Sequence, residues 1–179
     1  MLIFVERGKK SMKEVEYDRK KTIEYAKKWA FDRNPNYYNF DSVGGDCTSF
    51  ASQCIYAGAK VMNYTKEKGW YYIDGNHKSP SWSGVEFLYN FLVNNKSVGP
   101  YGKEIKQEDM ELLQIGDMAQ ISFDGYKYAH SLIIVNIENR FSLIGIKIAS
   151  HTFDSFNKAI SEYSLNKVRF IHIEKVRKY

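Results

Sequence analysis

The feature that most constrains the fold is the order of two kinds of segment along the chain. The first half carries helical patterns, because good helix formers fill residues 13–31 and apolar residues recur on one face of residues 46–58 and 81–93. Helices followed by strands predict an α+β fold in which N-terminal helices pack on a C-terminal antiparallel β-sheet. The strands are expected in the second half, where β-branched and aromatic residues fill residues 118–123, 130–137, 141–149 and 168–176.

Domain organisation follows from the length and from the breaks between these segments. A chain of 179 residues fits one domain. We expect residues 1–12 to be an N-terminal tail and residues 13–179 to be a single domain. The Asn-Pro-Asn sequence at residues 34–36 should end the first helix, and residues 59–81 should form an irregular loop.

Composition narrows the possible partners only slightly. Lys and Arg total 26 against 21 Asp and Glu, which gives a formal net charge of +5. This charge favours acidic partners such as nucleic acid, anionic lipid or an anionic cell wall, and it is too small to choose among them. Aromatic residues make up 16% of the chain, which suits either a core filled with rings or a groove that stacks on sugar or peptide.

Cys47 and Cys54 both lie within the second predicted helix. Seven residues of helix rise ~10.5 Å, which exceeds the Cα separation of ~7 Å that a disulfide tolerates. The spacing also fits a metal site poorly, because paired metal ligands on one helix stand about three or four residues apart. We therefore expect two separate thiols, with Cys54 as a small buried side chain on the apolar face of Phe50 and Ala57.

Cys47 follows two glycines and an aspartate, at the point where this helix should begin. The first N–H groups of a helix have no internal partner, and the helix dipole stabilises a thiolate there. Such a position can activate a cysteine as a nucleophile, and the same N–H groups can hold an oxyanion. The alternative is a structural cysteine near a helix cap.

A thiolate nucleophile needs a base, and two histidines stand at informative places. His130 opens one predicted strand and His151 ends the next. If these strands form a hairpin, the two rings are neighbours at one edge of the sheet, as a base and its orienting residue require. By spacing alone, two unrelated surface histidines are the default. His77 lies in a polar loop, and His172 falls inside the last predicted strand, where a core or edge residue is expected.

Several of these residues carry a family resemblance. GDCTSF at residues 45–50 is similar to the cysteine motif of NlpC-like cell-wall cysteine peptidases, LQIGD at 113–117 resembles their L-x-x-G-D element, and HSLIIV at 130–135 resembles their histidine strand. The bacterial "putative amidase domain" family within that papain-like group matches more closely, from Tyr17 onward, with Ser49 in place of the usual Asn. Its motifs are YDRKKTIEYA at 17–26, NPNY at 34–37, GGDCTSFASQ at 44–53, WYY at 70–72, SW at 81–82, HSLIIV at 130–135 and HTFD at 151–154.

The resemblance implies a papain-like fold of the NlpC/CHAP type and a cysteine-dependent amidase or peptidase. Cys47 would be the nucleophile and His130 the base, and the two would rest as thiolate and imidazolium. His151 would hold the third polar position, with Asp154 on the same turn as the alternative. Asp46 would cap the helix or steady the preceding loop. No metal and no cofactor are implied.

The substrate that the resemblance implies is bacterial peptidoglycan, cut either at the sugar–alanine amide or inside the stem peptide. Trp70, Tyr71, Tyr72 and Trp82 could form a wall of the substrate groove, and the equally weighted alternative is that they pack their loop over the core. We expect no nucleic-acid partner, no membrane insertion and a monomer.

The start of the chain bears on where such an enzyme would act. Residues 1–20 contain no signal-peptide core, and no stretch reaches the ~18 apolar residues needed to cross a bilayer. The resemblance then fits a phage-type lysin released through a pore, a delivered toxin, or a catalytic domain cut from a longer protein. Two other functions stay open: acyl transfer on protein substrates by a deamidase-like or transglutaminase-like toxin, and wall binding by a domain with a degenerate site.

Overall fold

The computed structural model describes residues 11–179, so the expected tail at residues 1–12 lies mostly outside the described residues. Helices precede most of the strands, as the sequence predicts. The helices are α1 (Arg19–Trp29), α2 (Cys47–Ala59), α3 (Pro80–Ser83) and α4 (Val85–Asn94), with short 3-10 turns η1 (Gln107–Leu112) and η2 (Ile160–Glu162). The strands are β1 (Lys13–Val15), β2 (Gly99–Ile105), β3 (Met118–Ser122), β4 (His130–Ile137), β5 (Ile146–Ser150), β6 (Ser155–Ala159) and β7 (Lys167–Lys178).

The described strands form one antiparallel sheet in the order β1-β7-β3-β4-β5-β6, and β2 also pairs with β7. Strand β4 lies between β3 and β5. His130, its first residue, pairs with Ile121 of β3, and the hairpin with β5 pairs Ile133 with Ala149. The start of β4 and the end of β5 therefore lie at the same end of the sheet, as the hairpin prediction requires.

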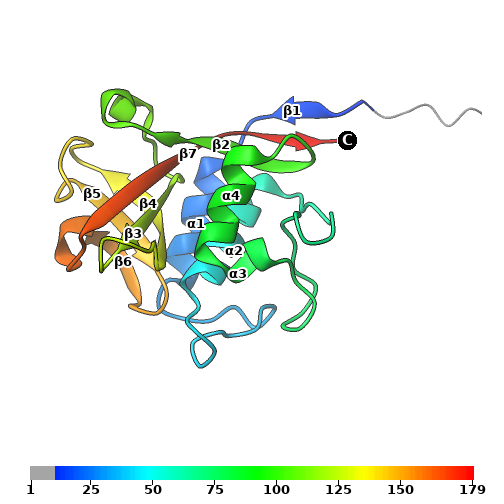
Figure 1. The fold of residues 1–179 in the computed structure, drawn as a ribbon, viewed down its shortest axis with the longest axis horizontal. Coiled ribbons are helices and arrows are strands. Elements are labelled where there is room, and N and C mark those ends of the chain that lie inside the picture. Colours follow the sequence, from blue (N-terminus) through cyan, green and yellow to red (C-terminus); the bar gives the residue numbers. More distant parts are fainter. Residues whose placement is uncertain (1–10) are drawn as a thin grey trace, which may run out of the picture.

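Helices cover one face of this sheet (Figure 1). Helices α1, α2 and α4 lie side by side, and α2 packs against both α1 and β4. Phe50 and Ile55 of α2 belong to the core between the two layers, together with Ile133 and Ile171 of the sheet, and all four are fully buried. The predicted α+β fold, with helices on an antiparallel sheet, is confirmed.

The opposite face of the sheet carries a second core. Ile121, Leu132 and Ile148 point into it, because side chains alternate between the two faces along each strand. Turns η1 and η2 flank this core, and Leu113 and Ile160 belong to it. Strands β3, β4 and β5 are thus largely buried on both faces, which explains the continuous apolar run in β4.

Two predicted helices have different limits in the structure. Residues 13–15 form strand β1 instead of the start of a helix, because their backbone pairs with the end of β7. The helix predicted over residues 81–93 is divided at Gly84, whose extended backbone separates α3 from α4. Pairing over long sequence distances overrides local helix propensity in the first case, and a glycine breaks the helix in the second.

The strand predictions are incomplete in the second half. The strand predicted over residues 141–149 begins at Ile146, because the preceding residues form a turn in which the Glu138 N–H bonds to the Gly145 carbonyl. The sequence does not predict β2 and β6. Both contain glycine or polar residues that lower strand propensity, and both are formed by pairing with longer neighbours.

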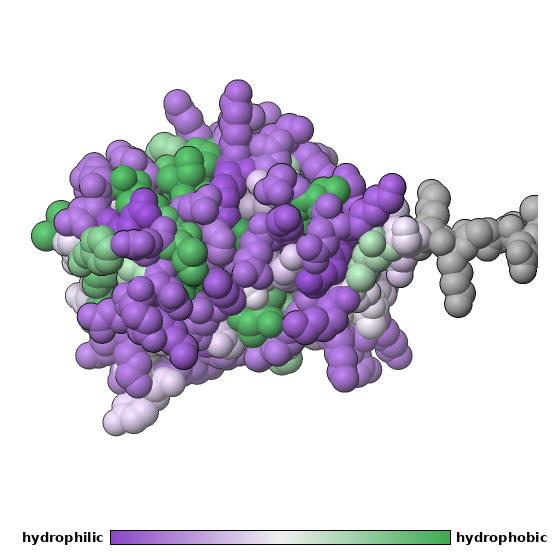
Figure 2. Space-filling view, turned by 90° about the horizontal axis from the view of Figure 1, so that it is seen from above, coloured by the Kyte–Doolittle hydropathy of each residue, from purple (hydrophilic) through white to green (hydrophobic). Residues whose placement is uncertain are grey.

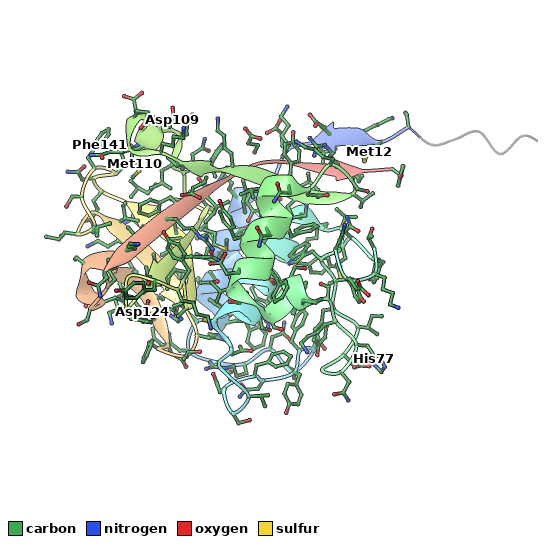
Figure 3. All side chains as sticks on the ribbon, in the orientation of Figure 1. Met12, His77, Asp109, Met110, Asp124 and Phe141 are labelled. Carbon is green, nitrogen blue, oxygen red and sulfur yellow. The ribbon has the colours of Figure 1, made fainter. Side chains whose placement is uncertain are left out.

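When the molecule is viewed from above relative to Figure 1, its surface is mostly hydrophilic, and its apolar side chains form separate patches (Figure 2). Phe141, which Figure 3 labels at the sheet end of the molecule, is one of the exposed apolar residues. Within residues 11–179, no helix combines the length and the hydrophobicity needed to span a membrane.

Candidate active site

Cys47 is the first residue of α2, and its exposed fraction is 6%. Asp46 occupies the N-cap position, but its side chain makes no capping hydrogen bond, so the expectation that it caps the helix is wrong. Its carboxylate turns away: Oδ1 accepts a hydrogen bond from the Phe40 N–H at 3.2 Å, and Oδ2 contacts His151 at 2.6 Å. Asp46 thus steadies the preceding loop and leaves the first-turn N–H groups beside the thiol uncapped.

Two glycines set the path of the chain into this helix. Gly44 and Gly45 have φ angles of 92° and 101°, in the left-handed region that favours glycine. A Cβ on Gly45 would lie 3.0 Å from Thr152 Oγ1, which accepts a hydrogen bond from the Asp46 N–H at 3.0 Å. The Gly-Gly sequence therefore lets the backbone before Cys47 approach the loop after β5 closely.

The thiol of Cys47 lies at the start of β4. The Thr48 hydroxyl lies 3.7 Å from the sulfur, and the backbone of Ser131 partly opposes the rise that burial causes in the pKa of the thiol. Thr48 Oγ1 lies 2.9 Å from Ser131 Oγ, which also accepts a hydrogen bond from Gln120 Nε2 at 3.2 Å. These contacts fasten the start of α2 to the residue that follows His130. Within residues 11–179, no hydrogen bond joins the thiol directly to the His130 ring.

The ring of His130 is held by Ser150, at the end of the neighbouring strand β5. His130 Nε2 lies 2.9 Å from Ser150 Oγ, and Ser150 Oγ donates its hydrogen to the His151 carbonyl at 2.8 Å. A hydroxyl has a single hydrogen, so Ser150 must accept from His130. The proton of a neutral His130 therefore sits on Nε2, and its lone pair sits on Nδ1.

Burial changes the acidity of both candidate catalytic groups. Burial lowers the pKa of His130, whose exposed fraction is 2%, to about 4. Burial also raises the pKa of the Cys47 thiol, although hydrogen bonds from Ser131 and Thr48 partly oppose this effect. Both shifts favour a neutral thiol and a neutral imidazole at rest, in place of the expected thiolate and imidazolium.

His151 lies in a different environment from the one expected. Its Nδ1 is 2.6 Å from Asp46 Oδ2, its Nε2 is 2.7 Å from the Trp29 carbonyl oxygen, and its ring stacks on Phe50 with centroids 3.8 Å apart. Both ring nitrogens are therefore engaged by acceptors. His151 joins α1, the nucleophile loop and the sheet, and it does not hold the ring of His130.

The neighbour of His130 is offset by one residue from the expected one. Successive side chains along a strand point to opposite faces of the sheet. Ser150 turns toward His130, and His151 turns toward the helices. The sequence correctly predicts that the end of this strand lies beside His130. It points to His151 as the neighbour, whereas the neighbour is the preceding residue, Ser150.

Asp154, the alternative third residue, also bonds to a residue other than His130. Its two carboxylate oxygens accept hydrogen bonds from the Arg33 guanidinium at 2.9 and 3.0 Å. Arg33 additionally bonds Asp41 at 3.0 Å, so this cluster fastens the loop after α1 to the loop after β5.

The aromatic residues proposed for the groove divide into two groups. Trp70 and Trp82 are fully buried in the core between the layers, with ring centroids 5.3 Å apart, so they pack the core and do not line a groove. Tyr71 and Tyr72 are half-buried, and the Tyr72 hydroxyl accepts a hydrogen bond from the Tyr38 N–H at 2.7 Å. The core alternative is thus correct for both tryptophans.

A different set of rings surrounds His130. The centroids of Phe153, Tyr163 and Phe123 lie 5.6, 5.7 and 6.3 Å from that of the histidine. Phe153 is the third residue of the HTFD motif, whereas Phe123 and Tyr163 belong to no motif. Nothing in the local sequence distinguishes these two from core residues.

The remaining cysteine and histidines lie apart from this site. Cys54 is fully buried, is not disulfide-bonded, and has a pKa that burial raises well above its usual value. His172 Nδ1 contacts Asp117 of the L-x-x-G-D element at 2.9 Å, and His77 is exposed on a loop far from the sheet (Figure 3). Among residues 11–179, no group of three or more His, Cys, Asp or Glu side chains could hold a metal ion.

Comparisons with known proteins agree with the resemblance to the "putative amidase domain" family. A family model described as "Putative amidase domain" matches residues 16–173. A Bacillus subtilis (strain 168) protein described as "Uncharacterized protein YhbB" is 31% identical over 123 residues. That similarity covers 67% of this chain and 37% of the relative, so the chain spans little more than a third of the relative's length. No solved structure matches the chain.

Proposed function

Because the chain belongs to the "Putative amidase domain" family, we propose that it hydrolyses an amide bond through a thioester on Cys47. The observation that carries this proposal is the arrangement of two side chains. Cys47 stands at an uncapped helix start, where the hydroxyl of Thr48 lies 2.9 Å from that of Ser131, the residue after His130, and His130 is held in one tautomer by Ser150. Such a pair supplies a nucleophile and a base beside a helix N-terminus, which is the arrangement of papain-like NlpC/CHAP-type hydrolases.

In the proposed reaction, Nδ1 of His130 takes the proton of the thiol as the sulfur attacks the amide carbon. The N–H groups at the start of α2 stabilise the oxyanion that forms. His130 then gives the proton to the leaving amine, the C–N bond breaks, and a thioester remains on Cys47. A water molecule, deprotonated by His130, hydrolyses the thioester and restores the thiol.

Ser150 and Asp46 support this chemistry without touching the reacting atoms. Ser150 keeps the proton of His130 on Nε2, which leaves Nδ1 as the base. Asp46 places its carboxylate between Phe40 and His151, so the negative charge is paired and kept out of the capping position. The oxyanion-binding N–H groups thus have no internal anion to compete for them.

The substrate that we propose is bacterial peptidoglycan, cut at the sugar–alanine amide or within the stem peptide. The family resemblance supports this choice, because the family resembles a group of cell-wall hydrolases, and the formal charge of +5 is compatible with an anionic wall. The aromatic rings of Phe123 and Phe153 beside His130 supply a surface for an uncharged part of such a substrate.

Digestion of purified bacterial cell wall tests this proposal. The wild type should release new amine and carboxyl termini, and mass spectrometry identifies which bond was cut. Cys47→Ala should release none, while Cys54→Ala is the matched control and should keep most of the activity, because Cys54 lies in the core. An intact wall, together with glutamine residues of a test protein converted to glutamate, would support a protein deamidase instead and contradict the proposal.

A further inference from the structure

Two exposed phenylalanine rings stand over the buried candidate base. Phe123 is 38% exposed and Phe153 is 54% exposed, whereas His130 beneath them is 2% exposed. The two phenyl centroids lie 6.5 Å apart and the ring planes meet at 80°. Single exposed apolar residues are common on protein surfaces, but these two meet at the group that is proposed to react.

The loop that carries Phe123 is held in place by its own hydrogen bonds. Asp124 Oδ1 accepts from the Ser122 hydroxyl at 3.0 Å and from the backbone N–H groups of Tyr126 and Lys127 at 2.8 and 2.9 Å. These bonds lower the pKa of Asp124 to about 2, so they persist at any pH near neutrality. Figure 3 labels Asp124 at the sheet side of the molecule.

The loop that carries Phe153 is fastened from two sides. Arg33 binds Asp154 through two hydrogen bonds, and Thr152 accepts a hydrogen bond from the Asp46 N–H. Ser155 Oγ donates to the Phe153 carbonyl at 2.5 Å. The position of the Phe153 ring is therefore tied to the residue immediately before the nucleophile.

Tyr163 adds a polar group to this apolar surface. Its ring packs against both His130 and Phe153, and the residue is buried. Its hydroxyl has no hydrogen-bond partner among the described residues, which costs free energy unless a bound group satisfies it. Lys158 Nζ lies 4.5 Å from the centroid of the same ring, so one cation is also near.

We propose that Phe123 and Phe153 form a binding surface for a neutral aliphatic side chain of the substrate, next to the amide that is cut. This inference rests on the proposed function, because it places that amide at Cys47. Two phenyl rings that meet nearly at a right angle present apolar carbon in two directions, which suits a compact aliphatic group. Asp124 follows Phe123 directly, and its carboxylate disfavours a negatively charged group at that ring, whereas the Lys158 ammonium is taken up by the face of Tyr163.

Alkylation of Cys47 tests this surface without a known substrate. The thiolate displaces iodide from an iodoacetamide, so a C–S bond forms and a C–I bond breaks. We compare N-butyl iodoacetamide, iodoacetamide and iodoacetate, each relative to its rate with free cysteine. The surface should make N-butyl iodoacetamide about fivefold to tenfold faster than iodoacetamide, since a few methylene groups become buried, and should make iodoacetate slower.

Variants and pH separate this inference from the proposed function. The double variant Phe123→Ala/Phe153→Ala should reduce the ratio of the alkylation rate with N-butyl iodoacetamide to that with iodoacetamide to about one. Phe141 is exposed elsewhere on the surface, so Phe141→Ala should not change this ratio. The ratio is also measured at pH 10, where ionisation of the thiol does not depend on His130. If the double variant leaves the ratio unchanged, or if iodoacetate labels Cys47 faster than iodoacetamide does, the proposed binding surface is contradicted. A bacterial wall that the wild-type protein leaves intact, with the ratio at pH 10 as expected, contradicts only the proposed function.

Discussion

The Nε2 atom of His130 lies 2.9 Å from the hydroxyl oxygen of Ser150, and that hydroxyl donates its hydrogen to the carbonyl of residue 151. A serine at the end of one strand thereby decides which nitrogen of a histidine at the start of the preceding strand carries the proton. The relationship gives Ser150 a positioning role that is separate from binding and from the overall stability of the fold.

Substitution of Ser150 should affect turnover more than binding. In Ser150→Ala the ring of His130 loses its partner and can rotate or change tautomer, so kcat should fall by about 100-fold with KM nearly unchanged. Ser150→Thr keeps the hydroxyl and should recover much of the rate. Initial rates of wall digestion measure both parameters, and Ser142→Ala, in the loop before β5, is the control. Equal losses in the alanine and threonine variants would contradict the role.

The same pair shows how far the sequence predicts the site. The hairpin that brings the start of β4 to the end of β5 follows from two apolar stretches and the turn between them. The sequence does not predict which residues of the second strand point to which face of the sheet, because residues 150 and 151 are both polar and either could face His130. The helices decide this orientation, since Phe50 and Asp46 receive the larger ring of His151.

Other differences from prediction have the same cause, which is packing between distant segments. Trp70 lies in a loop that is rich in turn formers and Trp82 in the short helix α3, and yet both are fully buried, because α2 and α4 leave a space that the two indoles fill. Phe123 and Phe153 are far apart in sequence and meet only when β3 and β5 take their places in the sheet. Local patterns predict the elements, and contacts across the sheet determine the surroundings of His130.

His151 should matter to stability more than to chemistry. It forms a buried ion pair with Asp46 and also bonds the Trp29 carbonyl. His151→Ala leaves the Asp46 carboxylate buried without its partner, so the free energy of unfolding should fall by about 3 kcal/mol. Urea unfolding followed by circular dichroism measures this loss. His130→Ala is the comparison, and it should abolish activity with a smaller loss of stability; the reverse order would refute the assigned roles.

The activity should persist into acid. His130 accepts a proton only when it is neutral, and burial lowers its pKa to about 4. The value of kcat/KM should therefore stay level from pH 7 to about pH 5 and fall about tenfold per pH unit below about pH 4. A decline that begins near pH 6.5 would show that His130 titrates as an ordinary histidine and would contradict a buried neutral base.

The same shift predicts how stability depends on pH. The pKa of His130 is about 4 in the folded protein against 6.5 for the unshifted group, so the unfolded chain binds a proton more readily. This contribution to stability is complete above pH 6.5 and is lost as the pH falls toward 4, by about 3 kcal/mol in total. The difference in unfolding free energy between wild type and His130→Gln should shrink by that amount over this window. A difference independent of pH would rule out the shift.

Gly45 offers a test of the approach between the nucleophile loop and the loop after β5. Gly44 and Gly45 share a left-handed backbone, so alanine at either position should cost about 1 kcal/mol of stability. A Cβ at Gly45 also meets Thr152 Oγ1 at 3.0 Å, whereas a Cβ at Gly44 meets nothing within 4 Å. Thr152 accepts the hydrogen bond of the Asp46 N–H, so Gly45→Ala should displace the start of α2 as well.

We expect Gly45→Ala to lower wall digestion at least about tenfold and Gly44→Ala to lower it little. The reason is that a displacement of a few tenths of an ångström at Cys47 disturbs the approach to the amide. Similar activities in the two variants would mean that the contact with Thr152 does not position the nucleophile.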